Sequence, residues 1–304
     1  MVLIDTGSTD ETVPIAHELD VVVRQILVQP WRFDDARNAG LALVDPDIDW
    51  IITVDMDEVL AQGWREKFDK GAARAAELGS RRMSYDYTWN WEEDGSPDIK
   101  FRGDRCHTRT GWRWVGPVHE VLAPSGWVTR SEEAGDAVYA GFGIEHYPDD
   151  SKSRGSYLGL LKLAALEEPH NPRQAHYLAR ELFFAGDWVA AREEFVRYLG
   201  MPEATWRAER AQSYRYIAAM DDDPERWLRM AVEEDSGRRD ALVDLVDFYV
   251  RSGRWDEARE LAKRALTMTT RPGDYMTTAH AYDDSYLYSV IRVQVAGHGQ
   301  GGGV

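Results

Sequence analysis

Three acidic residues stand directly after an apolar segment near the start of the chain. Residues 50–54 are apolar or β-branched, and Asp55, Asp57 and Glu58 follow them. Clustered carboxylates repel one another unless a cation or hydrogen-bond donors compensate their charge. Hard oxygen ligands at the end of a strand suit Mg²⁺ or Mn²⁺, with a nucleotide diphosphate bridging the ion. The pattern therefore predicts a metal site at this run of three carboxylates.

A second polar turn, residues 5–10, follows the apolar run at residues 2–4. A carboxylate at the carboxyl end of a strand faces the ligand crevice of an open α/β sheet, so Asp5 could accept hydrogen bonds from a ribose or base. Gly7 permits the chain to turn tightly. The alternative is that the acid and hydroxyl side chains of this turn cap the following helix.

Strands and helices must position these two turns. Short apolar runs predict buried strands, and helical spacing lies between them. Their alternation predicts an α/β sandwich with a mainly parallel sheet. The strands are expected at residues 2–4, 21–27 and 50–54, the helices at 34–44 and 63–78, and further strands or hairpins at 82–91, 100–107 and 111–122.

From about residue 151 the hydrophobic period becomes helical. Stretches around Gly186 and Gly253 each contain a helix, a glycine turn, an aromatic residue and a second helix with alanine at the close-packing position. The glycines lie about two 34-residue periods apart, which leaves room for a divergent repeat at residues 214–234. This spacing is typical of tetratricopeptide repeats, with a plain helical bundle as the alternative.

The chain is thus expected to contain an α/β domain at residues 1–150 and an all-α repeat domain at 151–296. The glycine-rich tail, residues 297–304, is expected to be disordered.

Five motifs stand in the order found in bacterial and phage glycosyltransferases of family 2, which have the GT-A fold. They comprise residues 5–10, 31–38, 54–58 with its D-x-D pair, 114–120, which looks like W-x-G-x-x-H-E, and 144–147. The resemblance implies a Rossmann-like domain that binds a nucleotide-sugar and a metal, followed by tetratricopeptide-like repeats. Family members carry a further strand, with a V-K-N-E-like segment, ahead of the first motif, and by the resemblance this sequence starts at the second strand. Either the true start lies upstream, or another segment fills the place of that strand, or the protein is a shortened form.

The resemblance also implies a role for individual residues. Asp5 and Arg37 would contact the nucleoside or its phosphates, as would the turn residues Ser8 and Asp10 and the first D-x-D residue, Asp55. Asp57 would bind the metal directly, Asp55 would belong to the same metal site, and His146 would be a further ligand or diphosphate contact. Glu120 would be the catalytic base. The implied reaction is inverting transfer from a nucleoside-diphosphate sugar, first a UDP-sugar, with Mn²⁺ or Mg²⁺.

Elementary chemistry agrees with these roles. In inverting transfer one carboxylate takes the proton of the acceptor as its oxygen attacks the sugar. A metal neutralises the charge that develops on the leaving diphosphate. No covalent nucleophile is needed.

The composition and charge of the chain disfavour several classes of protein. The net charge of −17 disfavours sequence-independent contact with DNA or RNA. The chain contains no apolar run near the roughly 20 residues that a membrane span needs. The single cysteine, Cys106, excludes an internal disulfide and favours a reducing compartment. We therefore expect a soluble, cytoplasmic protein.

Several alternatives stay open. The chain could be a catalytically weak or inactive nucleotide-binding scaffold, or it could glycosylate a modified nucleic-acid base through a local basic patch at residues 81–82 or 102–113. The acceptor could be a protein, a saccharide or such a base. Trp89, Trp91 and Trp112 could stack on a sugar or pack on the sheet. The apolar edge at residues 2–4 is expected to be covered by another segment or by a second copy in a homodimer.

Overall fold

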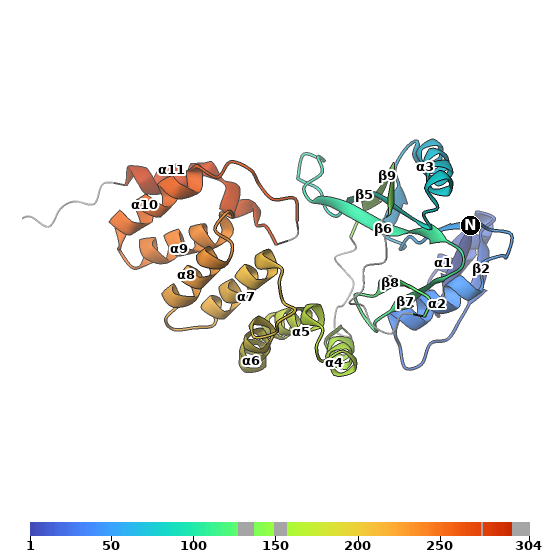
Figure 1. Cartoon of the computed structure of the whole chain (residues 1–304), viewed down its shortest axis with the longest axis horizontal. Coiled ribbons are helices and arrows are strands. Elements are labelled where there is room, and N and C mark those ends of the chain that lie inside the picture. Colours follow the sequence, from blue (N-terminus) through green and yellow to red (C-terminus); the bar gives the residue numbers. More distant parts are fainter. Residues whose placement is uncertain (127–136, 149–156, 275, 294–304) are drawn as a thin grey trace, which may run out of the picture. The chain divides into compact units, whose positions relative to one another are not determined.

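The computed structural model describes residues 1–126, 137–148, 157–274 and 276–293 (Figure 1). Its contacts divide the chain into an N-terminal unit, Met1–Pro169, and a repeat unit, His170–Val304. Helix α4 (Tyr157–Glu167), which lies beyond the predicted boundary at residue 150, is part of the N-terminal unit. The predicted glycine-rich tail lies outside the described residues. No helix in the described ranges is long and apolar enough to cross a membrane.

The N-terminal unit begins with two parallel strands, β1 (Val2–Asp5) and β2 (Val22–Gln25), connected through α1 (Thr12–Glu18). Helix α2 (Phe33–Ala42) packs closely on β1, since a Cβ atom at Gly40 would lie 3.0 Å from Ile4. Within the described residues β1 pairs only with β2. A second copy that covers the other edge of β1 therefore stays a prediction.

Both strands were predicted to be buried, and that prediction is wrong. Val2 is 37% exposed and Val22 is 43% exposed. The physical reason is the small size of this sheet, because among the residues that the structure describes each of its strands has only the other as a strand neighbour. A short apolar run indicates a strand but does not reveal how many strands flank it.

The main sheet has five strands in the order β3–β6–β5–β9–β4. Its members are β3 (Trp50–Ile52), β4 (Glu58–Leu60), β5 (Arg82–Thr88), β6 (Lys100–Thr108) and β9 (Val138–His146). The predicted α/β class is confirmed, but this sheet is mixed rather than mainly parallel, since only β5 and β9 pair in parallel. Strands β5 and β6 follow each other without a helix between them, and such neighbours pair antiparallel.

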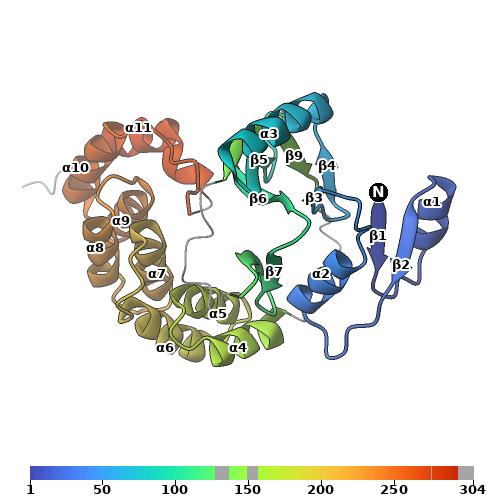
Figure 2. The ribbon, with the colours of Figure 1, turned by 45° about the vertical axis from the view of Figure 1, so that its right-hand side comes forward.

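Helix α3 (Trp64–Leu78) packs on strands β5 and β9 (Figure 2). The core between them contains Tyr85 and Phe142, whose rings stack with centroids 5.0 Å apart. A separate antiparallel hairpin, β7 (Trp112–Val115) and β8 (Val121–Pro124), lies next to α2. Helix α1 was expected only under the helix-capping alternative for residues 5–10. Strand β9 was not predicted; Gly141 and Gly143 interrupt its apolar pattern, and glycine is unfavourable in strands.

Gly103 provides a test of how tightly this core is packed. A Cβ atom at Gly103 would lie 2.4 Å from the Tyr85 ring, and Tyr85 is fully buried. We expect Gly103→Ala to lower the free energy of unfolding by about 1–3 kcal/mol because a core ring must shift. Urea unfolding measures the loss. Gly159→Ala is the matched control, since its Cβ would meet no atom within 4 Å and the helix gains up to about 1 kcal/mol. Equal stability of the Gly103 variant and the wild type would contradict the close contact.

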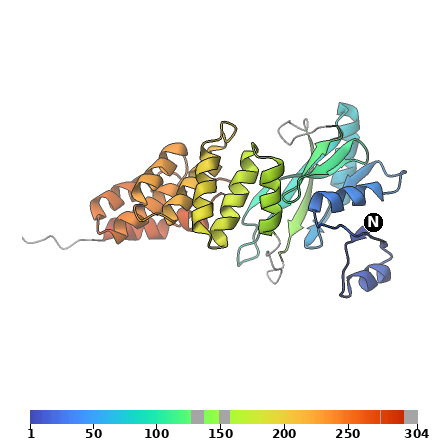
Figure 3. The same ribbon diagram turned by 90° about the horizontal axis from the view of Figure 1, so that it is seen from below.

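The repeat unit consists of helices that lie side by side in sequence order (Figure 3). Consecutive pairs form hairpins: α5 (Pro172–Phe184) with α6 (Trp188–Leu199), α7 (Arg207–Ala219) with α8 (Glu225–Glu234), and α9 (Asp240–Arg251) with α10 (Trp255–Leu266), followed by η1 (Ala279–Tyr282) and α11 (Asp284–Arg292). Ala191 and Ala258 are fully buried at the positions predicted for close packing. The predicted all-α helical repeat is confirmed.

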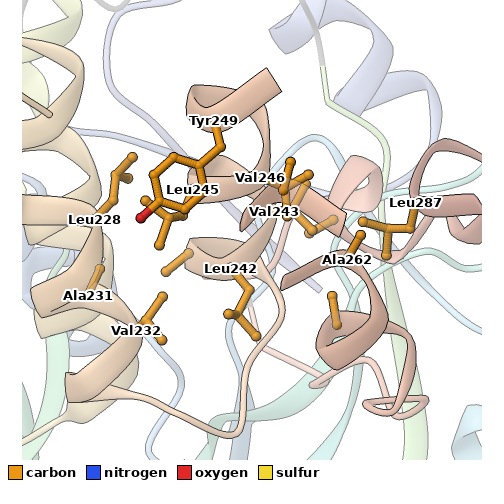
Figure 4. Packing of buried hydrophobic residues seen from close by; sticks show 14 of the residues in the cluster. Leu228, Ala231, Val232, Leu242, Val243, Leu245, Val246, Tyr249, Ala262 and Leu287 are labelled. Atoms are coloured by element: carbon orange, nitrogen blue, oxygen red, sulfur yellow. The ribbon is translucent and has the colours of Figure 1, made fainter. Parts of the chain in front are cut away.

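The hydrophobic core of the last two hairpins joins neighbouring helices. Leu228 of α8, Leu242 and Val246 of α9 and Ala262 of α10 lie in one cluster with Leu287 of α11 (Figure 4).

The middle hairpin turns at Asp221-Asp222-Asp223-Pro224, where the flanking hairpins have Gly186 and Gly253 with φ of +80° and +71°. The predicted divergent repeat is therefore the α7–α8 hairpin.

Candidate functional site

Helix α2 fixes the segment that leads to Glu120. The Asn38 side chain donates to the Trp114 carbonyl at 2.9 Å and accepts from the Trp114 amide at 2.8 Å. Asp34 accepts from the Gly116 amide at 2.9 Å, and the Phe33 amide donates to the Pro117 carbonyl at 3.0 Å. Two motifs that are distant in the sequence, residues 31–38 and 114–120, are thus one structural element.

Asp34 carries a buried negative charge in this element. Burial alone would raise its pKa, but the hydrogen bond and charge of Arg32 and the amide of Gly116 outweigh burial, so the pKa of Asp34 lies below its ordinary value. A lowered pKa in the folded state means that the charge stabilises the fold above the unfolded pKa of about 3.9, and that this stabilisation is lost as pH falls through the folded pKa.

We therefore expect Asp34→Asn to lower the free energy of unfolding at pH 7 by about 1.5–3 kcal/mol, the range for hydrogen bonds to charged groups. The difference from the wild type should shrink as pH falls below about 3.9, the unfolded pKa, and should be lost only below the lower folded pKa, where the carboxylate of the folded wild type is also protonated. Urea unfolding at pH 7 and at low pH measures both effects. Asp35→Asn is the control, because Asp35 lies in the same helical turn with its side chain 60% exposed. A pH-independent loss would show that the charge of Asp34 is not its cause.

Glu120 follows a residue with an unusual backbone. His119 has φ of +48°, a left-handed conformation that non-glycine residues rarely adopt. Such strained positions concentrate at functional sites. The Glu120 side chain is 11% exposed and accepts a hydrogen bond from Nε of Arg37.

Arginines compensate the clustered carboxylates. Arg37 also contacts Asp55, with Nη2 and Oδ1 2.9 Å apart, so one guanidinium joins Glu120 to the D-x-D segment. Arg105 of β6 donates to Asp55 Oδ2 at 2.8 Å and also to Glu58. Burial raises the pKa of Asp55, but the charges of Arg37 and Arg105 outweigh it and the pKa is lowered. The charge compensation that the acidic run requires is therefore supplied around Asp55 by these two guanidinium groups.

Glu58 anchors the turn that contains both aspartates. Its side chain is 2% exposed, and it accepts from the Tyr87 hydroxyl at 2.6 Å and from the Asp55 amide at 2.7 Å. Arg105 completes its hydrogen bonds. Sequence reasoning did not assign Arg105 to the site, because its place beside the acidic turn depends on the antiparallel pairing of β3 with β6.

Asp57 and His146 meet at the other side of this turn. Nδ1 of His146 lies 2.8 Å from the Trp89 carbonyl, and a carbonyl only accepts, so Nδ1 carries the proton. In the neutral ring Nε2 is then an acceptor, and it lies 3.9 Å from Oδ2 of Asp57. The Tyr147 amide donates to the Asp57 carbonyl at 2.8 Å and fixes the two segments together.

This arrangement fits a divalent ion. Metal-binding histidines usually donate their second N–H to a carbonyl or carboxylate, as His146 does to Trp89. The described residues contain no group of three or more His, Cys, Asp or Glu side chains that could hold a metal. Mg²⁺ is commonly held by one or two carboxylates together with substrate phosphates, and Asp57 with His146 would supply a pair of protein ligands of this kind.

The first turn is held mainly by its own contacts. Asp5 is buried and accepts from the Ser8 amide at 3.0 Å and from Gln25 of β2 at 3.1 Å, and hydrogen bonds from Ser8 lower its pKa. Asp10 accepts from the Thr12 amide at 3.0 Å where α1 begins, which agrees with the helix-capping alternative for this residue. Nucleotide contacts of Asp5, Ser8 and Asp10 stay predictions.

The N-terminal part of the chain matches a known protein family. Residues 1–132 match the family model described as Glycosyl transferase family 2. A search of curated proteins finds no match.

Solved structures show distant similarity. MamA is 19% identical, with 48% of this chain and 90% of that chain covered and a TM-score of 0.33. The structure of S. aureus TarS 1–349 is 14% identical, with 95% and 80% covered and a TM-score of 0.26. A second structure of S. aureus TarS is 13% identical, with 90% and 50% covered and a TM-score of 0.27.

Proposed function

We propose, since residues 1–132 form a family-2 glycosyltransferase domain, that this chain transfers a sugar from a nucleoside-diphosphate donor with inversion and with the help of Mn²⁺ or Mg²⁺. A UDP-sugar is the first candidate donor. The observation that carries the proposal is the orientation of His146, whose Nε2 faces the Asp57 carboxylate at 3.9 Å. The Arg37–Glu120 pair lies beside the same turn, joined to it through Asp55.

The residues have distinct roles in this proposal. Asp57 and His146 would hold the ion, with Asp55 beside them, and the ion would neutralise charge on the leaving diphosphate. Glu120 accepts the proton of the acceptor hydroxyl at its carboxylate. Arg37 orients Glu120, and the Trp89 carbonyl accepts from Nδ1 of His146, so that in the neutral ring Nε2 is the nitrogen available to the ion. Asp5, Ser8 and Asp10 bind the nucleoside end of the donor.

A thermal-shift panel tests this function. UDP, GDP and dTDP are each added with and without Mn²⁺, and one of them is expected to raise the melting temperature only with the ion. A ligand that binds the native state alone at 100 times its Kd adds about 2.7 kcal/mol of stability. Donor hydrolysis and transfer are then measured with sugars of that nucleotide. No shift with any nucleotide and ion would reject the proposal in favour of a scaffold role.

Two of the basic residues that suggested the nucleic-acid alternative face carboxylates. Arg82 is paired with Asp104 at 3.1 Å, and Arg102 lies 3.8 Å from Asp86. These two guanidinium groups therefore give the alternative no specific support.

A further inference from the structure

A row of aromatic side chains runs along one face of the main sheet from the core to the surface. Tyr85, Tyr87 and Trp89 occupy alternate positions, which point to one face of a strand. Their exposure rises from 0% to 4% to 44%. Tyr85 stacks on Phe142, which contacts Phe68 of α3, so the helix covers the beginning of the row. Trp89 follows the end of β5 and remains exposed.

Other rings extend this exposed end. Phe101 of β6 is 38% exposed, with its centroid 6.3 Å from that of Trp89. Trp91 stacks on Tyr147 with centroids 5.4 Å apart and an interplanar angle of 11°, and Tyr147 is 50% exposed. We call Trp89, Trp91, Phe101 and Tyr147 the aromatic platform. Soluble proteins rarely expose several large apolar side chains next to one another. Where they do, the cluster generally marks a binding site.

The platform adjoins the candidate site directly. The Trp89 ring stacks on His146 with centroids 4.9 Å apart, and its carbonyl fixes Nδ1 of the same histidine. The Trp91 indole donates to the His146 carbonyl at 2.9 Å. A molecule that covers Trp89 would therefore lie next to the residue that stacks on His146.

Polar groups at the rim limit what can lie on these rings. The Tyr147 hydroxyl donates to Glu145 at 3.1 Å, so a carboxylate lies at the edge of the rings. An apolar peptide segment or an acyl chain would cover this carboxylate without offering it a new donor, which is costly. A sugar ring presents C–H groups on its face and hydroxyl donors at its edge, so it suits both the rings and the carboxylate.

We propose that the aromatic platform binds a sugar ring of the acceptor, so that the acceptor is a saccharide or a glycosylated molecule. The proposal rests on the proposed function, because the position of the platform beside His146 is what makes its ligand the acceptor. Trp89 supplies the main stacking surface, and Phe101 and Tyr147 flank it.

Saturation-transfer difference NMR on the whole chain tests this binding. The probes are methyl β-glycosides of glucose, galactose and N-acetylglucosamine, with a leucine-containing tripeptide and UMP as competing classes. Saturation is expected on the ring protons of at least one glycoside without added nucleotide or ion. Trp89→Ala should weaken that binding about threefold to tenfold, the scale of an aromatic contact. Trp89→Phe should fall between the two, because it keeps a ring over His146.

Trp188→Ala is the matched control, since Trp188 is 61% exposed in the repeat unit, and it should bind the glycoside like the wild type. Phe101→Ala serves as a second test if Trp89→Ala lowers the melting temperature. The platform is rejected if no glycoside binds, if binding survives Trp89→Ala unchanged, or if the tripeptide or UMP binds there instead.

The thermal-shift panel separates this proposal from the proposed function. A nucleotide shift without glycoside binding rejects the platform and leaves the glycosyltransferase function intact. Glycoside binding at Trp89 without any nucleotide shift rejects the function and with it the identity of the sugar as an acceptor.

Discussion

Glu120→Gln is expected to lower sugar transfer by about 10²-fold or more while nucleotide binding persists. The amide cannot take the proton of the acceptor hydroxyl, and loss of a general base typically costs this much. Its side-chain oxygen can still accept from Arg37, so the loop conformation should survive. Initial rates at saturating donor and acceptor measure the loss, and the thermal shift with Mn²⁺ and nucleotide measures binding.

Glu66→Gln is the control for this substitution. Glu66 lies on the surface of α3, where it pairs with Lys70, and its variant should turn over like the wild type. Normal turnover of Glu120→Gln would show that another carboxylate, and not Glu120, is the catalytic base.

Asp57→Asn is expected to abolish the Mn²⁺-dependent thermal shift. The neutral amide is a much poorer ligand for a hard divalent ion than a carboxylate. The fold should persist, because the Tyr147 amide is bound by the backbone carbonyl of residue 57 rather than by its side chain. At 100 times Kd the wild-type shift corresponds to about 2.7 kcal/mol, and this is the amount that the variant should lose.

Two further variants sharpen the metal test. His146→Gln should weaken the shift as well, since it removes the Nε2 that faces Asp57. Asp69→Asn changes an exposed aspartate on α3 and should leave the shift intact. If the Asp57→Asn variant kept the full shift, Asp57 would not be a metal ligand.

Local sequence patterns predicted much of the fold. Helices α2 and α3 and the three hairpins of the repeat unit follow from periodicity and turn residues, because their contacts are close in sequence. The mixed pairing of the main sheet and the exposure of β1 and β2 did not follow, since both depend on which distant strands become neighbours.

In the candidate site, too, the parts that are local in sequence were predictable and the parts that depend on distant strand pairing were not. The acidic turn at Asp55 and Asp57 was predictable because strand and carboxylates are contiguous in the sequence. Its approach to His146 was expected only from the resemblance, and in the structure it depends on the β4–β9 pairing. Arg105 was missed because no local pattern distinguishes an arginine that faces a buried glutamate from one that faces solvent.

The guanidinium of Arg37 contacts Glu120 and Asp55 together, and this sharing has a thermodynamic consequence. A ligand that draws Arg37 toward one partner changes the free energy of its contact with the other. Linkage is reciprocal, so a molecule that engages Glu120 must alter affinity at the Asp55 side by the same factor that a ligand there alters affinity at Glu120. One side chain thus links occupancy on the two sides of the candidate site.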